Sequence, residues 1–573
     1  GRNLAPPLIC AQWLWDREIT EINSYLVFKK EFTLSQINPE SKYTLYISAD
    51  SQYEVFINGN FIGTGQYPDY ECYKVYDIYN IGDMLRIGEN CLSVNAYWQG
   101  ESSSVYRKAP AGVIFALCEN DVVFASSDQT TLCTVYRNYK SGDVAKISPQ
   151  LSFSFEYDAR EDLPPFKPAD VVDKKVDFYP RPIKRLEIQP EKPASVISQG
   201  IFIDPNPSAL IGQRMQYAYM SYQDYSFLNM NNCGAELPSP GGLAFSYQSD
   251  AATFSGIYVV VDLGENSAGF LALDIDLPED CLVLAGFGEH LEDLRVRSFV
   301  GGRNFCASYY GKKGRNRFIH RFKRIGLRYL QLFVYSHSFT LYYAGICPTV
   351  YPVSETPLFA CDDSLHNKIY EVCIKTLHLC MHEHYEDCPW REQALYAMDS
   401  RNQMLCGYYA FGEYDFPKAS LRLMALSIRD DDLLELCSPG EVSVTIPSFS
   451  AVFVTALYEY LLHSGDCVFT REVLPVARRI VDGFIRRIDP GCGLVPCYTE
   501  AGYWNFYEWQ QGLDGGAIFR DYPLPVSYDA PLNAFVSMAI QSLSSIFAVL
   551  QESSSAKYYG EIAQRLNQCM DKA

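Results

Sequence analysis

The sequence of 573 residues lacks any uninterrupted run of about 18 apolar residues, the length that an α-helix needs to cross a bilayer. It also lacks a surplus of basic residues, because 48 Lys and Arg stand against 68 Asp and Glu, which gives a formal net charge of -20. Proteins bind nucleic acids and anionic membranes chiefly through clusters of Lys and Arg. The sequence therefore predicts a soluble protein whose partners include neither a membrane nor a nucleic acid.

The cysteines lack a regular spacing. There are 19 of them, whereas secreted domains usually pair their cysteines in short, patterned frameworks. The N-terminus also lacks a basic segment followed by an apolar stretch, which is the pattern of a signal peptide. Both features favour a cytoplasmic protein, although a periplasmic or secreted protein whose signal peptide has been removed would have the same sequence.

Short alternating runs of apolar and polar residues, separated by turn residues, fill the first part of the chain. Asn58-Gly59 lies between two such runs, and this dipeptide signals a β-hairpin because both residues tolerate positive φ. We expect residues 1–190 to form a β-sandwich of the jelly-roll type. Further strand-like runs predict a second β-sandwich in residues 191–355; they cover 257–261, 270–275, 282–287 and 327–334.

The apolar pattern takes a helical period in residues 356–573. One helical stripe comprises Ile369, Val372, Cys373, Thr376, Leu377 and Cys380. Further helices are predicted at 451–463, before Gly465, and at 473–488, 532–550 and 556–570. Paired helices joined by long loops predict an (α/α)6-barrel-type catalytic domain. The helices are too few for six hairpins, so we expect a barrel truncated at its C-terminal end.

Reactive side chains are densest between His382 and Asp399. Pro389 suits the first turn of a helix, with Asp387 or Cys388 as the N-cap. Glu392 and Asp399 would then lie seven residues apart on nearly the same helix face. Hydrolysis of a glycosidic bond needs one carboxylic acid to protonate the leaving oxygen and a second carboxylate opposite it.

The residues alone leave other readings open. The segment could be a capped helix whose acids and Arg391 are ordinary surface charges. A metal could be bound by Cys380, His382, His384 and Cys388, but their spacing fits no standard zinc pattern, so we expect neither a metal nor a cofactor. A Cys388 nucleophile activated by His384 would lack a third, orienting group, which favours a structural thiol.

The run Asp387-Cys388-Pro389-Trp390-Arg391-Glu392-Gln393, followed by Asp399, resembles the signature of the bacterial α-L-rhamnosidases of glycoside hydrolase family 78. Residues 413–416, 446–450 and 456–466 are similar to later segments of the same family. The resemblance implies an inverting exo-glycosidase that removes terminal α-L-rhamnose from glycosides or polysaccharides, with no cofactor.

The resemblance also implies roles for individual residues. Glu392 would be the general acid, and Asp387, Arg391 and Asp399 would bind the sugar. The aromatic stretch 503–509 resembles the wall of the family's sugar pocket, with Trp504 and Trp509 as substrate-binding residues. A deoxy sugar presents a methyl group, for which Tyr396 or Trp504 would supply an apolar wall.

The sequence departs from the family pattern at the general base, for which no residue matches. Glu500, Glu508, Asp521 and Asp529 remain open candidates. An incomplete barrel would expose apolar helix faces, which favours a homo-oligomer. The alternative is a non-catalytic carbohydrate-binding or scaffold protein derived from a glycosidase, which would bind sugars through a sandwich similar to carbohydrate-binding modules, on loops near Trp98 or at residues 67–70.

Overall fold

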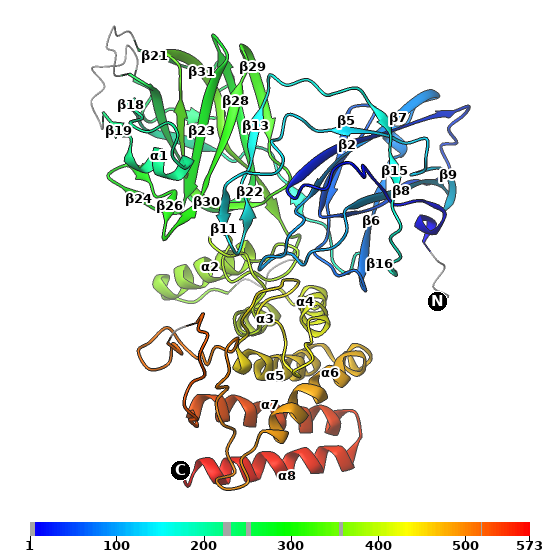
Figure 1. Cartoon of the computed structure of the whole chain (residues 1–573), viewed down its shortest axis with the longest axis vertical. Helices are drawn as coiled ribbons and strands as arrows, with labels where there is room; N and C mark the ends of the chain where they lie inside the picture. The colour runs from blue at the N-terminus through cyan, green and yellow to red at the C-terminus, as the bar shows by residue number, and fades with distance from the viewer. Residues whose placement is uncertain (1–5, 222–230, 248–253, 355–358, 517) are drawn as a thin grey trace.

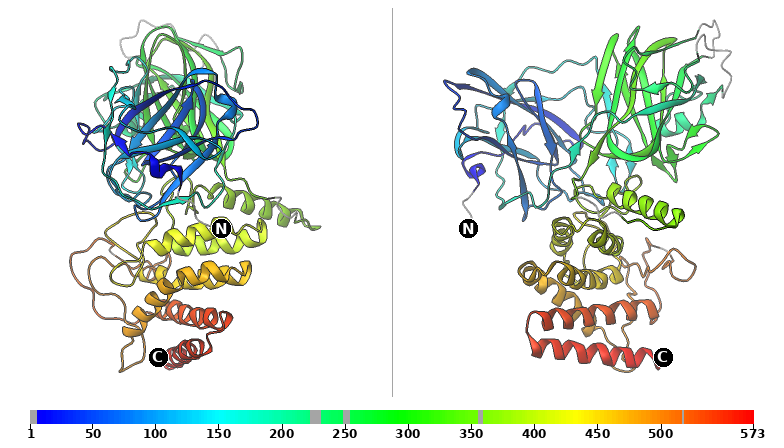
Figure 2. Two further views of the ribbon diagram at one scale, coloured as in Figure 1. Left: turned by 90° about the vertical axis from the view of Figure 1, so that its right-hand side faces the viewer. Right: turned by 180° about the vertical axis from the view of Figure 1, so that it is seen from behind.

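The computed structural model describes residues 6–221, 231–247, 254–354, 359–516 and 518–573. Two β-rich units lie side by side, and a stack of helices lies below them (Figure 1). The views in Figure 2 show the same arrangement from the side and from behind, with α7 and α8 farthest from the β-rich units. The predicted order of a β-rich N-terminal part followed by a helical C-terminal part is confirmed.

Two sheets enclose the core of the first β-rich unit. One sheet contains β1 (Leu14–Trp15), β3 (Tyr43–Asp50), β6 (Lys74–Asn80), β8 (Gly112–Glu119), β9 (Val122–Ser126), β15 (Asp170–Val171) and β16 (Phe178–Pro180). The other contains β2 (Ser24–Leu34), β4 (Gln52–Ile57), β5 (Asn60–Gly65), β7 (Gly88–Trp98), β10 (Leu132–Val135) and β14 (Lys167–Pro168). Alternate residues of both sheets are buried between them, among them Phe28, Ile47 and Phe115.

The predicted hairpin is confirmed at β4 and β5. Asn58 and Gly59 adopt φ values of 51° and 81°, which only glycine and a few polar residues tolerate.

A single long strand organises the second β-rich unit. Strand β22 (Gly256–Leu277) pairs first with β18 (Ala194–Ile203) and β30 (Ile325–Val334), then with β29 (Gly314–Ile319) and β31 (Ser338–Val350). A register shift between Asp262 and Ser267 separates its two halves. The same sheet includes β13 (Glu156–Asp158), β17 (Glu187–Ile188), β19 (Tyr219–Met220), β20 (Glu236–Leu237), β21 (Leu243–Ser246), β23 (Cys281–Gly288) and β28 (Cys306–Gly311).

Short elements extend this unit. Helix α1 spans Ile211–Tyr217. The hairpins are β11 (Lys146–Ser148) with β12 (Ser152–Phe153), β24 (Leu291–Glu292) with β25 (Arg295–Val296), and β26 (Phe299–Val300) with β27 (Arg303–Asn304). The last of these hairpins contributes a residue to the candidate active site.

Seven helices make up the helical part of the described chain. They are α2 (Ser364–Leu379), α3 (Ala397–Ala410), α4 (Asp415–Leu426), α5 (Pro447–Ser464), α6 (Cys467–Arg486), α7 (Ala530–Val549) and α8 (Ser553–Met570). The helices predicted for α5 to α8 are confirmed, and Gly465 ends α5 with φ 69°. Helix α6 buries its predicted stripe, including Val473, Ile480 and Phe484.

The stripe predicted for α2 is not buried as expected. Ile369 and Val372 are 51% and 49% exposed, and Cys373 is also exposed. Only Leu377 and Cys380, at the C-terminal end of the stripe, are buried. The reason is that α2 projects from the body of the molecule, so that its N-terminal half has no neighbour among the described helices (Figures 1 and 2).

Helix α7 packs between α5 and α8. Within the described residues it is the one helix long and apolar enough to span a membrane, with mean hydropathy 1.5 and 61% of that stretch buried inside the protein. Its packing between two other helices accounts for this apolar composition.

Polar contacts join the three parts. The Thr64 hydroxyl lies 3.4 Å from the Arg321 carbonyl oxygen, which links the two β-rich units. The Tyr70 hydroxyl donates to the Leu423 carbonyl of α4 (3.1 Å).

Candidate active site

The predicted active-site residues lie on the loop between α2 and α3, which we call the acid loop (residues 380–396). The sequence predicts instead a helix that starts at Pro389 and carries Glu392 and Asp399 on one face. That prediction is wrong, because residues 389–392 form a turn and α3 begins only after the loop. Glu392 therefore comes from the loop, and Asp399 from the first turn of α3.

Hydrogen bonds close the acid loop on itself. The Asp387 amide donates to the Ala394 carbonyl (3.0 Å), and the Ala394 amide donates to the Asp387 carboxylate (3.0 Å). Asp387 and Cys388 are thus not helix N-caps, contrary to the prediction. An Asp side chain that binds a nearby backbone amide offers the chain an alternative to a helix, and here that alternative prevails.

Strand β30 fixes the acid loop from the second β-rich unit. Gln393, at φ 53°, donates its side-chain amide to the carbonyl oxygens of Pro389 (2.8 Å) and Arg324 (3.0 Å). Gly326 of β30 lies against the loop, and a Cβ atom there would be 2.3 Å from the Pro389 carbonyl oxygen. The close approach of the two backbones therefore requires glycine at this position.

Trp390 anchors the loop in the core of the second β-rich unit. It is buried, and its ring lies 4.9 Å from the ring of Phe305 and 5.7 Å from that of His290, measured between centroids. The second β-rich unit therefore holds the acid loop, although the loop lies in sequence between two helices of the helical part.

The structure brings Asp387, Glu392 and Asp399 into one electrostatic cluster. Burial, together with the negative charges of Glu392 and Asp399, raises the pKa of Asp387 to about 7. Burial also raises the pKa of Asp399, again with a contribution from Glu392. Asp387 can therefore retain a proton near neutral pH beside Glu392.

Glu392 contacts one residue of its own loop and one residue of the second β-rich unit. The Tyr396 hydroxyl donates to Glu392 Oε2 (2.8 Å). Arg303 of β27 places Nη2 3.6 Å from Glu392 Oε1. The Glu392 side chain keeps 22% of its surface exposed, so a ligand can reach it.

Arg391 follows Trp390 on the acid loop. It is exposed, and its positive charge acts on Glu289, whose pKa is raised by burial and lowered by His290 and Arg391. Arg391 of the acid loop and Glu289 of the second β-rich unit are thus close enough for their charges to interact.

The two predicted tryptophans form an aromatic cluster. Trp504 is buried and donates its indole N–H to the Asp514 carbonyl (2.8 Å), whereas Trp509 is 74% exposed. Both pack against Phe506, at 4.7 and 4.8 Å between ring centroids.

The aromatic cluster leads toward the acids. Phe506 lies 6.4 Å from Phe449, and Phe449 lies 6.4 Å from Tyr396, the hydrogen-bond partner of Glu392. The path from Trp504 to Glu392 is therefore a series of rings rather than a direct contact.

Sequence reasoning missed Arg303 and Glu289. Both belong to the second β-rich unit and are far from the acid loop in sequence, and no local pattern marks them. Tyr396 was expected only as an apolar wall, and its hydroxyl instead binds Glu392.

The sequence left open a metal site and a Cys388 nucleophile, and the structure shows where the residues concerned lie. Among the described residues, no group of three or more His, Cys, Asp and Glu is placed to hold a metal ion. His382 Nδ1 pairs with Glu386 (2.7 Å), and His384 Nδ1 with the Tyr385 carbonyl (2.7 Å). Burial raises the pKa of the Cys388 thiol to about 12, which disfavours the thiolate that a nucleophile needs.

The four candidate bases do not share one site. Asp529 accepts a hydrogen bond from Tyr507 (2.9 Å), and Glu508 accepts one from the amide of its neighbour Trp509 (2.7 Å). Glu500 and Asp521 are exposed. These contacts single out none of the four as a base.

The aromatic residues considered for sugar binding on the first β-rich unit are largely internal. Tyr67 and Tyr70 are buried. Trp98 is half-buried, packs edge-on against Trp15, and donates to the Ala109 carbonyl (3.0 Å). These rings do not form an exposed platform for a sugar.

Comparisons with known proteins match the C-terminal part of the chain to a family model and the whole chain to solved structures. Residues 354–573 match the model of the bacterial alpha-L-rhamnosidase 6 hairpin glycosidase domain. A protein of Formosa agariphila named alpha-L-rhamnosidase is 24% identical over 247 residues, which are 39% of this chain and 26% of that protein. The chain thus spans about a quarter of the length of this relative.

Solved structures resemble the whole described fold. A rhamnosidase of glycoside hydrolase family 78 from Bacillus sp. GL1 superposes with a TM-score of 0.82 at 19% identity, over 100% of this chain and 77% of that one. The α-L-rhamnosidase of Streptomyces avermitilis, solved in complex with L-rhamnose, gives a TM-score of 0.67 at 14% identity, over 96% of this chain and 49% of that one. At these identities the likeness establishes the fold.

Proposed function

Residues 354–573 belong to the bacterial α-L-rhamnosidase six-hairpin glycosidases, as the resemblance of the acid loop to glycoside hydrolase family 78 predicts, and from this premise we propose that the chain hydrolyses terminal α-L-rhamnosides with inversion of configuration. The substrate would be a rhamnose-containing glycoside or polysaccharide, cleaved at its non-reducing end. The observation that carries the proposal is the cluster of Asp387, Glu392 and Asp399, in which Asp387 has a pKa of about 7.

In the proposed mechanism, Glu392 protonates the glycosidic oxygen as the bond to the sugar breaks. A water molecule, activated by a carboxylate on the opposite face of the sugar, attacks the anomeric carbon in the same step, so no covalent intermediate forms. The Tyr396 hydroxyl and Arg303 hold the Glu392 carboxyl in a fixed orientation. Asp387 keeps a proton in the cluster near neutral pH.

The sugar would bind through the charged residues around the acid. Asp387 and Asp399 offer carboxyl oxygens, and Arg391 a planar set of N–H donors, to the hydroxyls of rhamnose. Trp504 and Trp509 would line the sugar pocket, and Tyr396 or Trp504 would provide the apolar wall that the methyl group of a deoxy sugar needs. The general base stays unassigned in this proposal.

The finer architecture is part of the same proposal. The two β-rich units would be β-sandwiches, a jelly-roll in residues 1–190 and a second sandwich in 191–355, and residues 356–573 would form part of an (α/α)6 barrel. Their likeness to rhamnosidase structures supports this division.

The decisive experiment is hydrolysis of a chromogenic aryl α-L-rhamnoside by the chain and by Glu392→Gln, with other aryl glycosides as controls. Loss of a general acid lowers kcat by about 10²- to 10⁴-fold. Glu561→Gln, at an exposed position on α8, serves as the matched control and should keep full activity. Absence of hydrolysis by the folded wild-type chain on every glycoside would favour a non-catalytic, carbohydrate-binding protein.

A further inference from the structure

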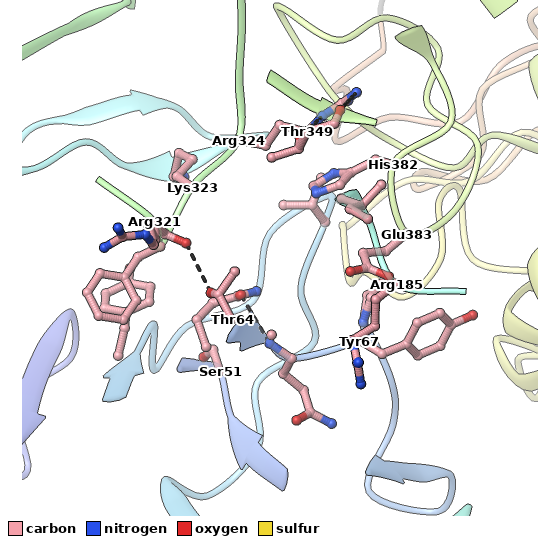
Figure 3. A pocket seen from close by; sticks show the side chains of 18 of the residues that line it. Ser51, Thr64, Tyr67, Arg185, Arg321, Lys323, Arg324, Thr349, His382 and Glu383 are labelled. Carbon is pink, nitrogen blue, oxygen red and sulfur yellow. Dashed lines mark hydrogen bonds between the residues drawn. The ribbon is translucent and has the colours of Figure 1, made fainter. Parts of the chain in front are cut away.

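A cavity of about 380 Å3 lies where the two β-rich units meet the acid loop. Figure 3 shows some of its lining side chains, which come from segments far apart in the sequence, among them residues 50–69, 321–324 and 382–386, and from single residues such as Arg185 and Thr349. Asp387, Glu392 and Asp399 are not among the lining residues, so the cavity is separate from the candidate active site. Its volume falls in the range of about 300–1,000 Å3 that small-molecule sites occupy.

Basic side chains surround this cavity, and most of them have carboxylate partners. Lys74 pairs with Asp69 (3.1 Å) and Asp50 (3.5 Å). Arg321 pairs with Glu54 (3.3 Å) and Arg324 with Glu386 (3.2 Å). The charges of these three residues are therefore balanced within the protein.

Two lining cations are not balanced in this way. Lys323 donates to the Leu151 carbonyl, and Arg185 to the Ile78 carbonyl. Among the described residues, neither has a carboxylate within ion-pair distance, although the whole chain carries a net charge of -20. An ammonium group removed from water without a counter-ion is costly, and burial lowers the pKa of Lys323 to about 8. A bound anion would remove that cost.

The remaining wall includes hydroxyl and amide groups, aromatic rings, His382, His384 and Glu383, whose carboxylate pairs with Arg181. Ser51, Thr64 and Gln66 supply polar atoms, and Phe61 and Tyr97 supply rings. Rings that contact the C–H face of a sugar, together with groups that bind its hydroxyls, form a typical sugar-binding surface. Lys323 and Arg185, which have no carboxylate partner among the described residues, add a preference for negative charge.

We propose that this cavity binds a small sugar acid, a polyhydroxylated ring that carries one carboxylate or phosphate, with Lys323 and Arg185 as the anion-binding residues. Lys323 is half-buried in the second β-rich unit, and Arg185 is exposed to solvent. The ligand would therefore enter past Arg185 and bring its anionic group to Lys323. The site is independent of the hydrolysis proposed above, because none of its residues is assigned to that reaction.

The test is direct binding of D-glucuronate and of glucose 6-phosphate to the full chain by isothermal titration calorimetry, with D-glucose as the neutral probe. We expect one of the two anions to bind saturably and glucose to bind at least tenfold more weakly. The anion that binds more tightly identifies carboxylate or phosphate as the ligand group. Lys323→Met and Arg185→Met should each weaken binding about tenfold or more, because each removes one ionic contact.

Lys313→Met is the matched control, since Lys313 is exposed on the same β-rich unit. It should bind like the wild type, and so should Glu392→Gln, whose substitution lies outside the cavity. Saturable binding of neither anion to a chain that melts cooperatively would overturn the proposal. Equal loss in Glu392→Gln and Lys323→Met would also overturn it, because the anion would then occupy the acid cluster.

Discussion

The hydroxyl group of Tyr396 donates a 2.8 Å hydrogen bond to Glu392, and the two residues lie on the same loop, four positions apart. The bond fixes one oxygen of the carboxyl and leaves the other toward Arg303. Glu392 is thus oriented before any substrate arrives, which is a requirement for efficient proton transfer.

Tyr396→Phe should therefore lower kcat on an aryl rhamnoside about tenfold while KM changes little. The ring that packs toward Phe449 is kept, so the loss reflects orientation of the acid rather than packing. Steady-state kinetics measure the effect, with Tyr409→Phe as the control at an exposed position. An equal loss in both variants would argue against the role of this hydrogen bond.

Asp387→Asn should stabilise the protein more at pH 8 than at pH 5. Because the pKa of Asp387 rises to about 7 in the folded state, the folded protein binds the proton more tightly than the unfolded chain, and stability falls as pH rises from about 4 to about 7. The substitution removes this loss and keeps an oxygen acceptor for the Ala394 amide. We expect a pH-dependent gain of about 1 to 2 kcal/mol. Urea unfolding at the two pH values measures it, and a difference that does not change with pH would contradict the prediction.

Arg303→Met should reduce kcat/KM about tenfold and leave the melting temperature within a few degrees of wild type. The substitution removes the only cation that β27 brings to Glu392 among the described residues. Arg297→Met is the matched control, because Arg297 lies on the neighbouring hairpin and pairs loosely with Glu292 (4.0 Å). Full activity in Arg303→Met would show that the second β-rich unit contributes no charge to the reaction.

Gly326→Ala should destabilise the fold by about 2 kcal/mol and abolish most of the activity, because the new methyl group would collide with the backbone of the acid loop. Gly241→Ala, where a Cβ atom meets nothing within 4 Å, should be neutral. Thermal unfolding and kinetics on both variants distinguish a local collision from a general effect of replacing glycine.

Local sequence signals predicted those elements whose causes are local. The Asn58-Gly59 hairpin and the end of α5 at Gly465 follow from backbone preferences of single residues, and the stripe of α6 follows from its period. The shape of the acid loop could not be predicted from local signals in this way. Pro389 favours a helix start, but the bonds that decide the loop's shape run to Ala394 and to Arg324, and the second of these lies in another unit.

The candidate site shows the same division. Three acids could be named from one short segment because they are close in sequence. Arg303 and Glu289 could not, because only the docking of the second β-rich unit brings them to the loop. The exposure of the apolar residues of α2 could not be predicted either, because the period of apolar residues shows which face of a helix is apolar but not what covers that face.

The pairing of Arg324 with Glu386 limits how this protein can be divided. Both side chains are fully buried, at 1% and 0% exposure, yet one belongs to a β-rich unit and the other to the acid loop. Separating a buried ion pair leaves each charge without its counter-ion, at a cost of about 3 to 5 kcal/mol. The helical part is therefore not an independent module: transferred to another scaffold, it would need a replacement for Arg324 as the counter-ion of Glu386.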